Sequence, residues 1–148
     1  MNNLISINKI SKHFITSKKI TVLNKISYNF RKGKIYSLVG PSGSGKSTLL
    51  NILSLIDKPS SGEIKIGINE IDHSKSIIND KIRANKIGII YQEKNLLADF
   101  TALENVYLAR LSVDNNKDKA IEDAEKIIKK MGLINRISHY PSELSGGE

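Results

Sequence analysis

The residues with the clearest chemical potential lie in one short segment, Gly40-Pro41-Ser42-Gly43-Ser44-Gly45-Lys46-Ser47. This segment matches the pattern G-x-x-x-x-G-K-[ST] of a phosphate-binding loop. Its glycines let the backbone curl until successive N–H groups converge on phosphate oxygens, and a helix that begins near Gly45 adds the positive end of its dipole. Lys46 would direct a full charge at the β- and γ-phosphates, Ser47 would offer a hydroxyl to Mg²⁺, and Thr48 would donate to phosphate. Residues 40–48, called the phosphate loop below, therefore predict a site for a nucleoside triphosphate, ATP.

The sequence on either side of the phosphate loop has the pattern that such a loop requires. Before it stands a mostly apolar run that is typical of a buried strand, Ile35-Tyr36-Ser37-Leu38-Val39. After it, residues 48–56 carry apolar side chains at helical spacing. A glycine-rich turn without a ligand would need neither a lysine nor a hydroxyl at these two positions. We therefore favour a binding site over a simple turn.

Further strands are predicted on both sides of this strand–loop–helix unit. Residues 4–10 and 21–30 are expected to form strands, although the apolar positions of the first are not in phase throughout. Residues 63–68 alternate and predict an antiparallel strand with one apolar face made by Ile64, Ile66 and Ile68. Residues 87–91 are a second candidate for a buried strand. A mixed α/β part is thus expected to cover residues 1–94.

A helical part is expected from residue 95 to residue 148. Thr101 and Glu104 have the spacing of a capping box, which marks the start of a helix. Gly132 is well placed to end a second helix. The apolar stripe of that second helix consists of Ala120, Ile121, Ala124, Ile127, Ile128 and Met131.

Composition excludes several classes of site. The 148 residues carry a net charge of +8, but the basic residues are scattered, so we expect no nucleic-acid partner. The sequence has no cysteine, and its three histidines lack the spacing of metal ligands. No apolar stretch approaches the roughly 20 residues of a membrane span. We therefore expect a cytoplasmic chain whose membrane role, if any, comes through a partner.

Three further features, together with the phosphate loop, resemble the ATP-binding subunit of an ABC transporter. Gln92 follows an apolar strand, as the Q-loop glutamine of that family does. Phe14 lies upstream of Val22-Leu23, where the family places an aromatic residue that stacks on adenine. The end of the chain resembles the LSGGQ signature with glutamate in the last position, Leu144-Ser145-Gly146-Gly147-Glu148. The four motifs stand in the family's order over essentially the whole chain.

This resemblance implies a fold and a set of roles. The fold would be α/β, a P-loop NTPase core with an antiparallel β subdomain and an α-helical subdomain, and the C-terminal part of the core would be missing. Ser47 and Gln92 would ligand Mg²⁺, and Phe14 would stack on the base. A second ATP-binding subunit would complete each site, because Ser145, Gly146 and Gly147 would reach the γ-phosphate held by the opposite chain.

A narrower resemblance points to the lipoprotein-releasing and macrolide-exporting type. It rests on the segments 55–64 and 95–106. In that type the ATPase lies peripherally at the cytoplasmic face of the bacterial inner membrane and pairs with integral membrane transporter subunits. The transported substrate is chosen by those membrane subunits.

Three catalytic elements of the family have no counterpart in this sequence: the Mg²⁺-binding Asp, the catalytic Glu and the switch His. Asp72 is the nearest imitation of the Asp, but the residues before it do not read as a buried strand. Because a positioned general base contributes typically 10²–10⁴-fold in rate, we expect the 148 residues to bind ATP without efficient hydrolysis.

Three interpretations stay open at this point. The sequence is the N-terminal part of a transporter ATPase, or a catalytically inactive nucleotide-binding remnant of one, or a non-transporter ATPase of the same superfamily. The coding sequence beyond Glu148 distinguishes the first two. The short stretch between Gln92 and Leu144 argues against the third, because it leaves no room for a long coiled-coil insertion.

Overall fold

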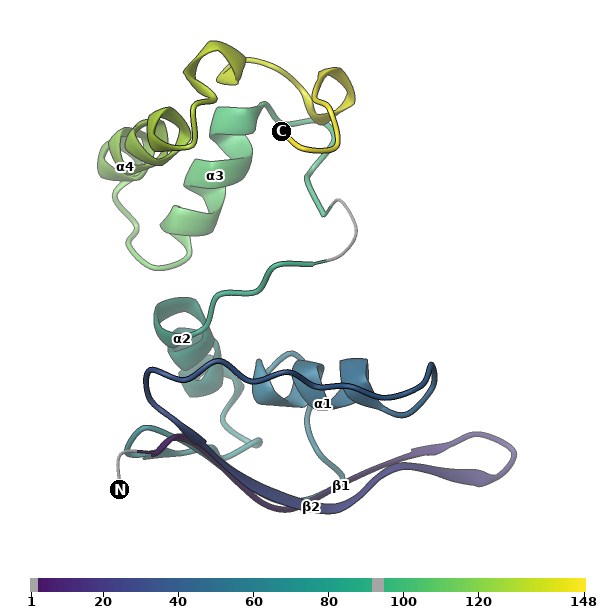
Figure 1. Cartoon of the computed structure of the whole chain (residues 1–148). Coiled ribbons are helices and arrows are strands. Elements are labelled where there is room, and N and C mark those ends of the chain that lie inside the picture. Colours follow the sequence, from purple (N-terminus) through teal and green to yellow (C-terminus); the bar gives the residue numbers. More distant parts are fainter. Residues whose placement is uncertain (1–2, 92–94) are drawn as a thin grey trace. The chain divides into compact units, whose positions relative to one another are not determined.

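The computed structural model of the chain describes residues 3–91 and 95–148 (Figure 1). The chain forms two compact units, Met1–Ile87 and Gly88–Glu148. The first unit contains all the strands of the described residues and two helices, α1 (Lys46–Leu53) and α2 (Ser76–Lys86). The second contains α3 (Ala102–Leu111), α4 (Lys117–Lys130) and two short 3₁₀ turns, η1 (Ile134–Arg136) and η2 (Pro141–Glu143).

The first unit is built on one antiparallel sheet. Its strands are β1 (Asn3–Ile15), β2 (Lys19–Arg31), β3 (Ser61–Ile66) and β4 (Asn69–Glu70), in the order β2-β1-β3-β4. The strands predicted at 4–10, 21–30 and 63–68 all form, and the first two are longer than predicted. Ile68 is an exception, because the chain turns at Gly67 and leaves Ile68 fully exposed.

Two β-bulges explain why the apolar positions of β1 are out of phase. Lys9 and Lys25 adopt positive φ angles of 51° and 49°, and the β1–β2 register shifts between Ile7 and Ile10. An extra residue in one strand restores the inward direction of the next apolar side chain. The bulged amides are satisfied reciprocally, since Lys9 N–H donates to Ser27 Oγ at 2.8 Å and Lys25 N–H donates to Ser11 Oγ at 3.0 Å.

The core of the first unit lies between this sheet and α1. Ile10 of β1, Ile52 of α1 and Ile64 of β3 are fully buried and belong to one hydrophobic cluster. Burial of one such side chain contributes roughly 1.5–3 kcal/mol. The helix that follows the phosphate loop is thus held on the sheet by its own apolar face, although it ends at Leu53 and not at Ile56 as the spacing predicted.

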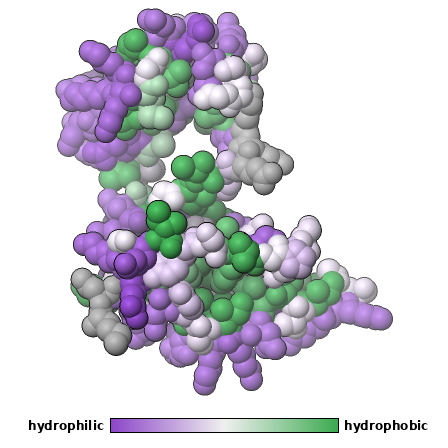
Figure 2. Space-filling view, in the orientation of Figure 1, coloured by the Kyte–Doolittle hydropathy of each residue, from purple (hydrophilic) through white to green (hydrophobic). Residues whose placement is uncertain are grey.

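The prediction of buried strands at residues 35–39 and 87–91 is wrong. Neither run joins the sheet, and Ile35, Val39 and Ile90 are 99%, 84% and 101% exposed. Apolar surface is visible on the first unit in Figure 2. A parallel strand exists only when neighbours on the sheet pair with its N–H and C=O groups. No strand of the described residues does so here, and the apolar composition alone does not suffice.

The second unit confirms the predicted helix start and stop. Thr101 caps α3, and its own N–H donates to the Glu104 carboxylate at 2.8 Å. Gly132 N–H and Leu133 N–H donate to the carbonyls of Lys129 and Ile128, which closes α4. The predicted stripe is only partly inside, since Ala120, Ala124 and Ile128 are buried but Ile127 and Met131 are exposed. None of the described helices combines the length and apolar character that crossing a membrane requires.

Candidate functional site

The phosphate loop joins the extended run 35–39 to α1. Gly45 is the N-cap of α1, with a φ angle of 88°. A Cβ atom at Gly45 would stand 3.0 Å from side-chain atoms of Val22 and Leu23 and 3.1 Å from the Val22 carbonyl oxygen. The loop therefore packs closely on β2, and a glycine is needed at this point both for its backbone angle and for its lack of a side chain.

Lys46 folds back over the loop that precedes it. Its Nζ atom donates to the carbonyl oxygens of Gly40 and Pro41, at 2.8 and 2.7 Å. Ser44 N–H closes the loop by donating to Pro41 O at 3.3 Å. The ammonium group is thus held at the carbonyls of the loop, where it both fixes the loop's shape and supplies a positive charge.

The amides at the start of α1 indicate a binding site for an anion. Leu49 N–H makes the first helical bond, to Gly45 O at 2.9 Å. The amides of residues 45–48 donate to no backbone or side-chain acceptor within the described part of the chain. Free N–H groups at a helix start, a nearby ammonium and the positive end of the helix dipole together favour negative charge. The residues present therefore fit a phosphate chain.

Phe14 lies near the end of β1, in the same unit as the phosphate loop. Its side chain is 45% exposed, so part of the ring is available for stacking. The Lys12 Nζ atom lies 5.1 Å from the ring centroid. Lys12 itself is buried, although a lysine in a strand pattern is normally taken for a surface residue. No local sequence pattern marks Lys12 as part of a site.

Residues 144–148, called the signature segment, form a capping arrangement. Ser145 N–H donates to Glu148 Oε2 at 2.8 Å, and Glu148 N–H donates to Ser145 Oγ at 3.4 Å. This is the S-x-x-E pattern that marks the start of a helix. Arg136 Nε donates to the other carboxylate oxygen, Glu148 Oε1, at 2.8 Å. Gly146 and Gly147 lie between the two capping residues and are exposed.

These contacts depress the pKa of Glu148 from 4.5 to about 2, with the Arg136 hydrogen bond as the largest cause and the Ser145 contacts next. The arrangement is therefore complete above the ordinary pKa and is lost as the pH falls through about 2. An NMR titration of the Ser145 amide should show a midpoint near 2 in the native chain. In Arg136→Ala the midpoint should rise toward 4.5. A native midpoint near 4.5 would contradict the geometry.

Two residues considered for metal binding do not form a described metal site. Gln92 lies outside the described residues. Asp72 stands in a turn, where it accepts from the Ser74 hydroxyl at 2.6 Å and from the Ser74 amide at 3.0 Å. The hydroxyl contact is the first cause of the lowered pKa of Asp72. Asp72 is thus a local cap, as expected of a residue that does not follow a buried strand, since β4 before it is exposed.

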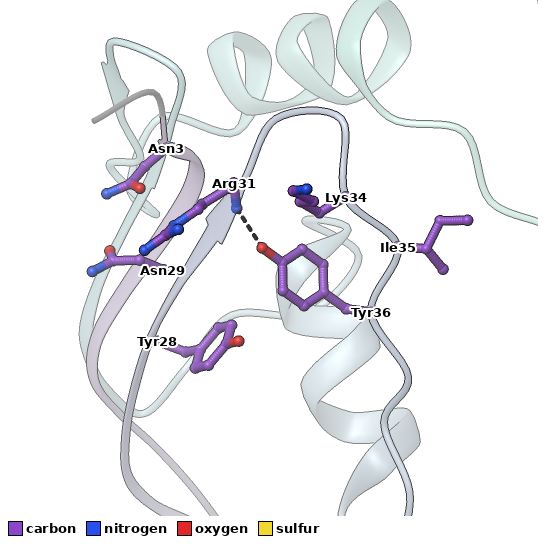
Figure 3. A pocket seen from close by; sticks show the side chains of 7 residues that line it. All are labelled: Asn3, Tyr28, Asn29, Arg31, Lys34, Ile35 and Tyr36. Carbon is purple, nitrogen blue, oxygen red and sulfur yellow. Dashed lines mark hydrogen bonds between the residues drawn. The ribbon is translucent and has the colours of Figure 1, made fainter.

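A cavity of about 610 Å³ lies away from the phosphate loop, beside β2 (Figure 3). Its wall contains Tyr28, Arg31 and Tyr36, and the Tyr36 hydroxyl accepts from Arg31 N–H at 2.8 Å. The rings of Tyr28 and Tyr36 meet edge to face, with centroids 5.8 Å apart. These contacts attach residues 35–39, which lead to the phosphate loop, to strand β2. We therefore interpret the cavity as part of the packing between this run and β2.

Comparison with known proteins gives a consistent result. A family model described as "ABC transporter" matches residues 23–148. The chain is similar to the lipoprotein-releasing system ATP-binding protein LolD of Rickettsia bellii (strain RML369-C), with 43% identity over 99% of this chain and 65% of the relative. Similarity to LolD of Rickettsia felis (strain ATCC VR-1525 / URRWXCal2) is 45% over 100% of this chain and 66% of the relative. The chain thus spans slightly less than two thirds of these curated relatives.

Solved structures agree. The dimeric structure of a post-hydrolysis state of the ATP-binding cassette MJ0796, bound to ADP and Pi, has a TM-score of 0.84 and 33% identity. The match covers 97% of this chain and 64% of that one. A dimeric structure of MJ0796, described as a bacterial ABC transporter cassette, has a TM-score of 0.83 and 34% identity. The predicted fold class, α/β with an antiparallel β part and a helical part, is confirmed.

Proposed function

This chain belongs to the ABC transporter family, and on that premise we propose that it is the ATP-binding subunit of a transporter that releases lipoproteins from the bacterial inner membrane. The phosphate loop carries the proposal, because its open amides and Lys46 form an anion site at the start of α1. The similarity to LolD proteins supports lipoproteins as the released substrate.

ATP would be held at two places on the first unit. The phosphates would accept hydrogen bonds from the amides of residues 45–48 and from Lys46. Gly40, Pro41, Ser42, Gly43 and Ser44 would shape the rest of the cradle. The exposed face of Phe14 would stack on adenine, an interaction worth roughly 1–3 kcal/mol for a base on an aromatic ring. Family members bind nucleotide in general, and MJ0796 was solved with ADP and Pi.

Mg²⁺ would be held by the Ser47 hydroxyl together with Gln92. Ser47 is exposed in the first turn of α1, and a hydroxyl oxygen suits this hard cation. When bound, Mg²⁺ would neutralise part of the phosphate charge. The chain's own residues would position the phosphate chain and keep Lys46 directed toward it.

A second copy of this chain would supply the signature segment to each nucleotide. Ser145, Gly146 and Gly147 are exposed in the second unit, and the solved MJ0796 cassettes are dimeric. The Ser145–Glu148 cap would hold the signature amides in one conformation, which favours binding to phosphate. Integral membrane subunits would be the further partners, and the chain would lie peripherally at the cytoplasmic face of the inner membrane.

A nucleotide titration tests this function. The 148-residue chain should bind ATP in the presence of Mg²⁺ and bind AMP much more weakly, because the phosphate loop makes the main contacts. Chelation of Mg²⁺ should weaken ATP binding. Equal affinity for ATP and AMP would reject the assignment of the phosphate loop.

A further inference from the structure

The turn that follows α1 is hydrogen-bonded to β1, the strand that carries Phe14. This post-helix turn, residues 57–60, begins where Ile56 N–H and Asp57 N–H both donate to Asn51 O of α1, at 2.9 and 3.1 Å. Its other end meets β1, since Ser60 N–H donates to Ser11 O at 2.8 Å. Ser60 Oγ accepts from His13 N–H at 3.1 Å and donates to His13 O at 3.3 Å.

Lys12 makes the central contacts between the post-helix turn and β1. Its ammonium donates to Asp57 Oδ1 at 2.7 Å and to Lys58 O at 2.8 Å. The Lys12 side chain is 11% exposed and that of Asp57 33%, which makes this the least exposed ion pair of the described residues. The same ammonium lies 5.1 Å from the Phe14 ring centroid, within the range of a cation–π contact.

These contacts between the post-helix turn and β1 therefore connect the two ends of the proposed nucleotide site. Helix α1 begins at the phosphate loop and leads at its C-terminal end into the post-helix turn. That turn holds Ser11, Lys12 and His13, which directly precede Phe14 in β1. A movement of the turn relative to β1 would change the distance between the ring and the phosphate loop, and hence the fit of a nucleotide that must reach both.

We propose that Lys12, through its ion pair with Asp57 and its contact with the Phe14 ring, is a positioning residue that sets the base-stacking side chain at the right distance from the phosphate loop. The proposal rests on the proposed ATP binding and deepens it. Lys12 acts on the adenine half of the ligand. It leaves the phosphate half unaffected, because its hydrogen bonds, ion pair and cation–π contact among the described residues all lie outside residues 40–48.

The test compares two ligands on the full 148-residue chain, ATP and inorganic tripolyphosphate, which lacks a base. Lys12→Met should lower the affinity for ATP about fivefold or more, the range of a lost base stack, and leave the affinity for tripolyphosphate within about twofold. Any unfolded fraction lowers both apparent affinities equally, so the ratio of the two reports positioning rather than stability. Lys65→Met is the matched control, because Lys65 of β3 is an exposed lysine paired with Glu70 of β4.

Further variants decide between positioning and a general structural role. Phe14→Ala should show the same loss of ATP affinity, and the double variant Lys12→Met with Phe14→Ala should lose no more than either alone. If Lys12→Met does not fold, Ser60→Ala removes the two bonds to His13 and should change the ratio in the same direction. An unchanged ratio, an equal loss for both ligands, or additive losses would overturn the proposal. If the native chain binds neither ligand, the proposed function itself fails.

Discussion

Replacing Lys46 by alanine is expected to abolish detectable ATP binding. The native ammonium makes two short bonds to the carbonyls of Gly40 and Pro41 and supplies the full charge at the phosphate loop. Each hydrogen bond to a charged group contributes roughly 1.5–3 kcal/mol, which corresponds to about 10- to 150-fold in affinity. The variant loses such a bond to phosphate and also the contacts that hold the loop's shape.

A titration of the Lys46→Ala chain with ATP in the presence of Mg²⁺ measures this effect. Lys81→Ala is a suitable control, because Lys81 is an exposed lysine of α2, outside the proposed site. Both variants lose one positive charge, so a difference between them isolates the position of the charge from net charge. A near-native affinity in Lys46→Ala would remove the basis for the proposed function.

Gly62→Ala is expected to destabilise the first unit by about 3 kcal/mol or more. Gly62 of β3 has a φ angle of 99°, and a Cβ atom there would stand 2.5 Å from Lys9 O and 2.7 Å from Asn8 O. These are backbone atoms of the β1 bulge, so no side-chain rotation relieves the clash. The strand pair must separate or the bulge must rearrange.

Urea denaturation followed by circular dichroism measures the free energy of unfolding of this variant. Gly67→Ala is the matched control, since its φ angle is also positive, at 60°, but no heavy atom lies within 4 Å of the added Cβ. It carries only the conformational cost, of the order of 1–2 kcal/mol. A Gly62→Ala chain no less stable than Gly67→Ala would show that the bulge accepts a side chain.

The parts of the fold that follow from local pattern could be predicted from the sequence. The apolar alternation of the antiparallel strands, the helix after the phosphate loop and the Thr101 capping box are all visible within short stretches of the sequence. The runs 35–39 and 87–91 could not be predicted in this way, because pairing into a sheet depends on partners far away in sequence. An apolar run shows only that a strand would be buried if it had neighbours.

The residues of the candidate site likewise fall into those that a local sequence pattern predicts and those that it does not. The phosphate loop is a contiguous pattern, and the geometry of α1 agrees with it. The roles of Phe14, Gln92 and the signature glycines came from family resemblance and stay predictions. Lys12 was missed because nothing in a lysine's immediate sequence says that its ammonium meets a carboxylate 45 positions away. The Ser145–Glu148 cap was missed although its S-x-x-E spacing stands in the sequence.

The bulge at Lys25 has a consequence for solubility. In the sheet of the described residues β2 has one neighbour, β1, so its outer side presents N–H and C=O groups to which a strand of another molecule could add. A bulge twists the strand locally and interrupts the regular row of those groups. Lys19 and Lys25 add positive charge to the same strand, and both are exposed. The irregularity that aligns the core of β1 and β2 thus also protects the long outer strand from edge-to-edge aggregation.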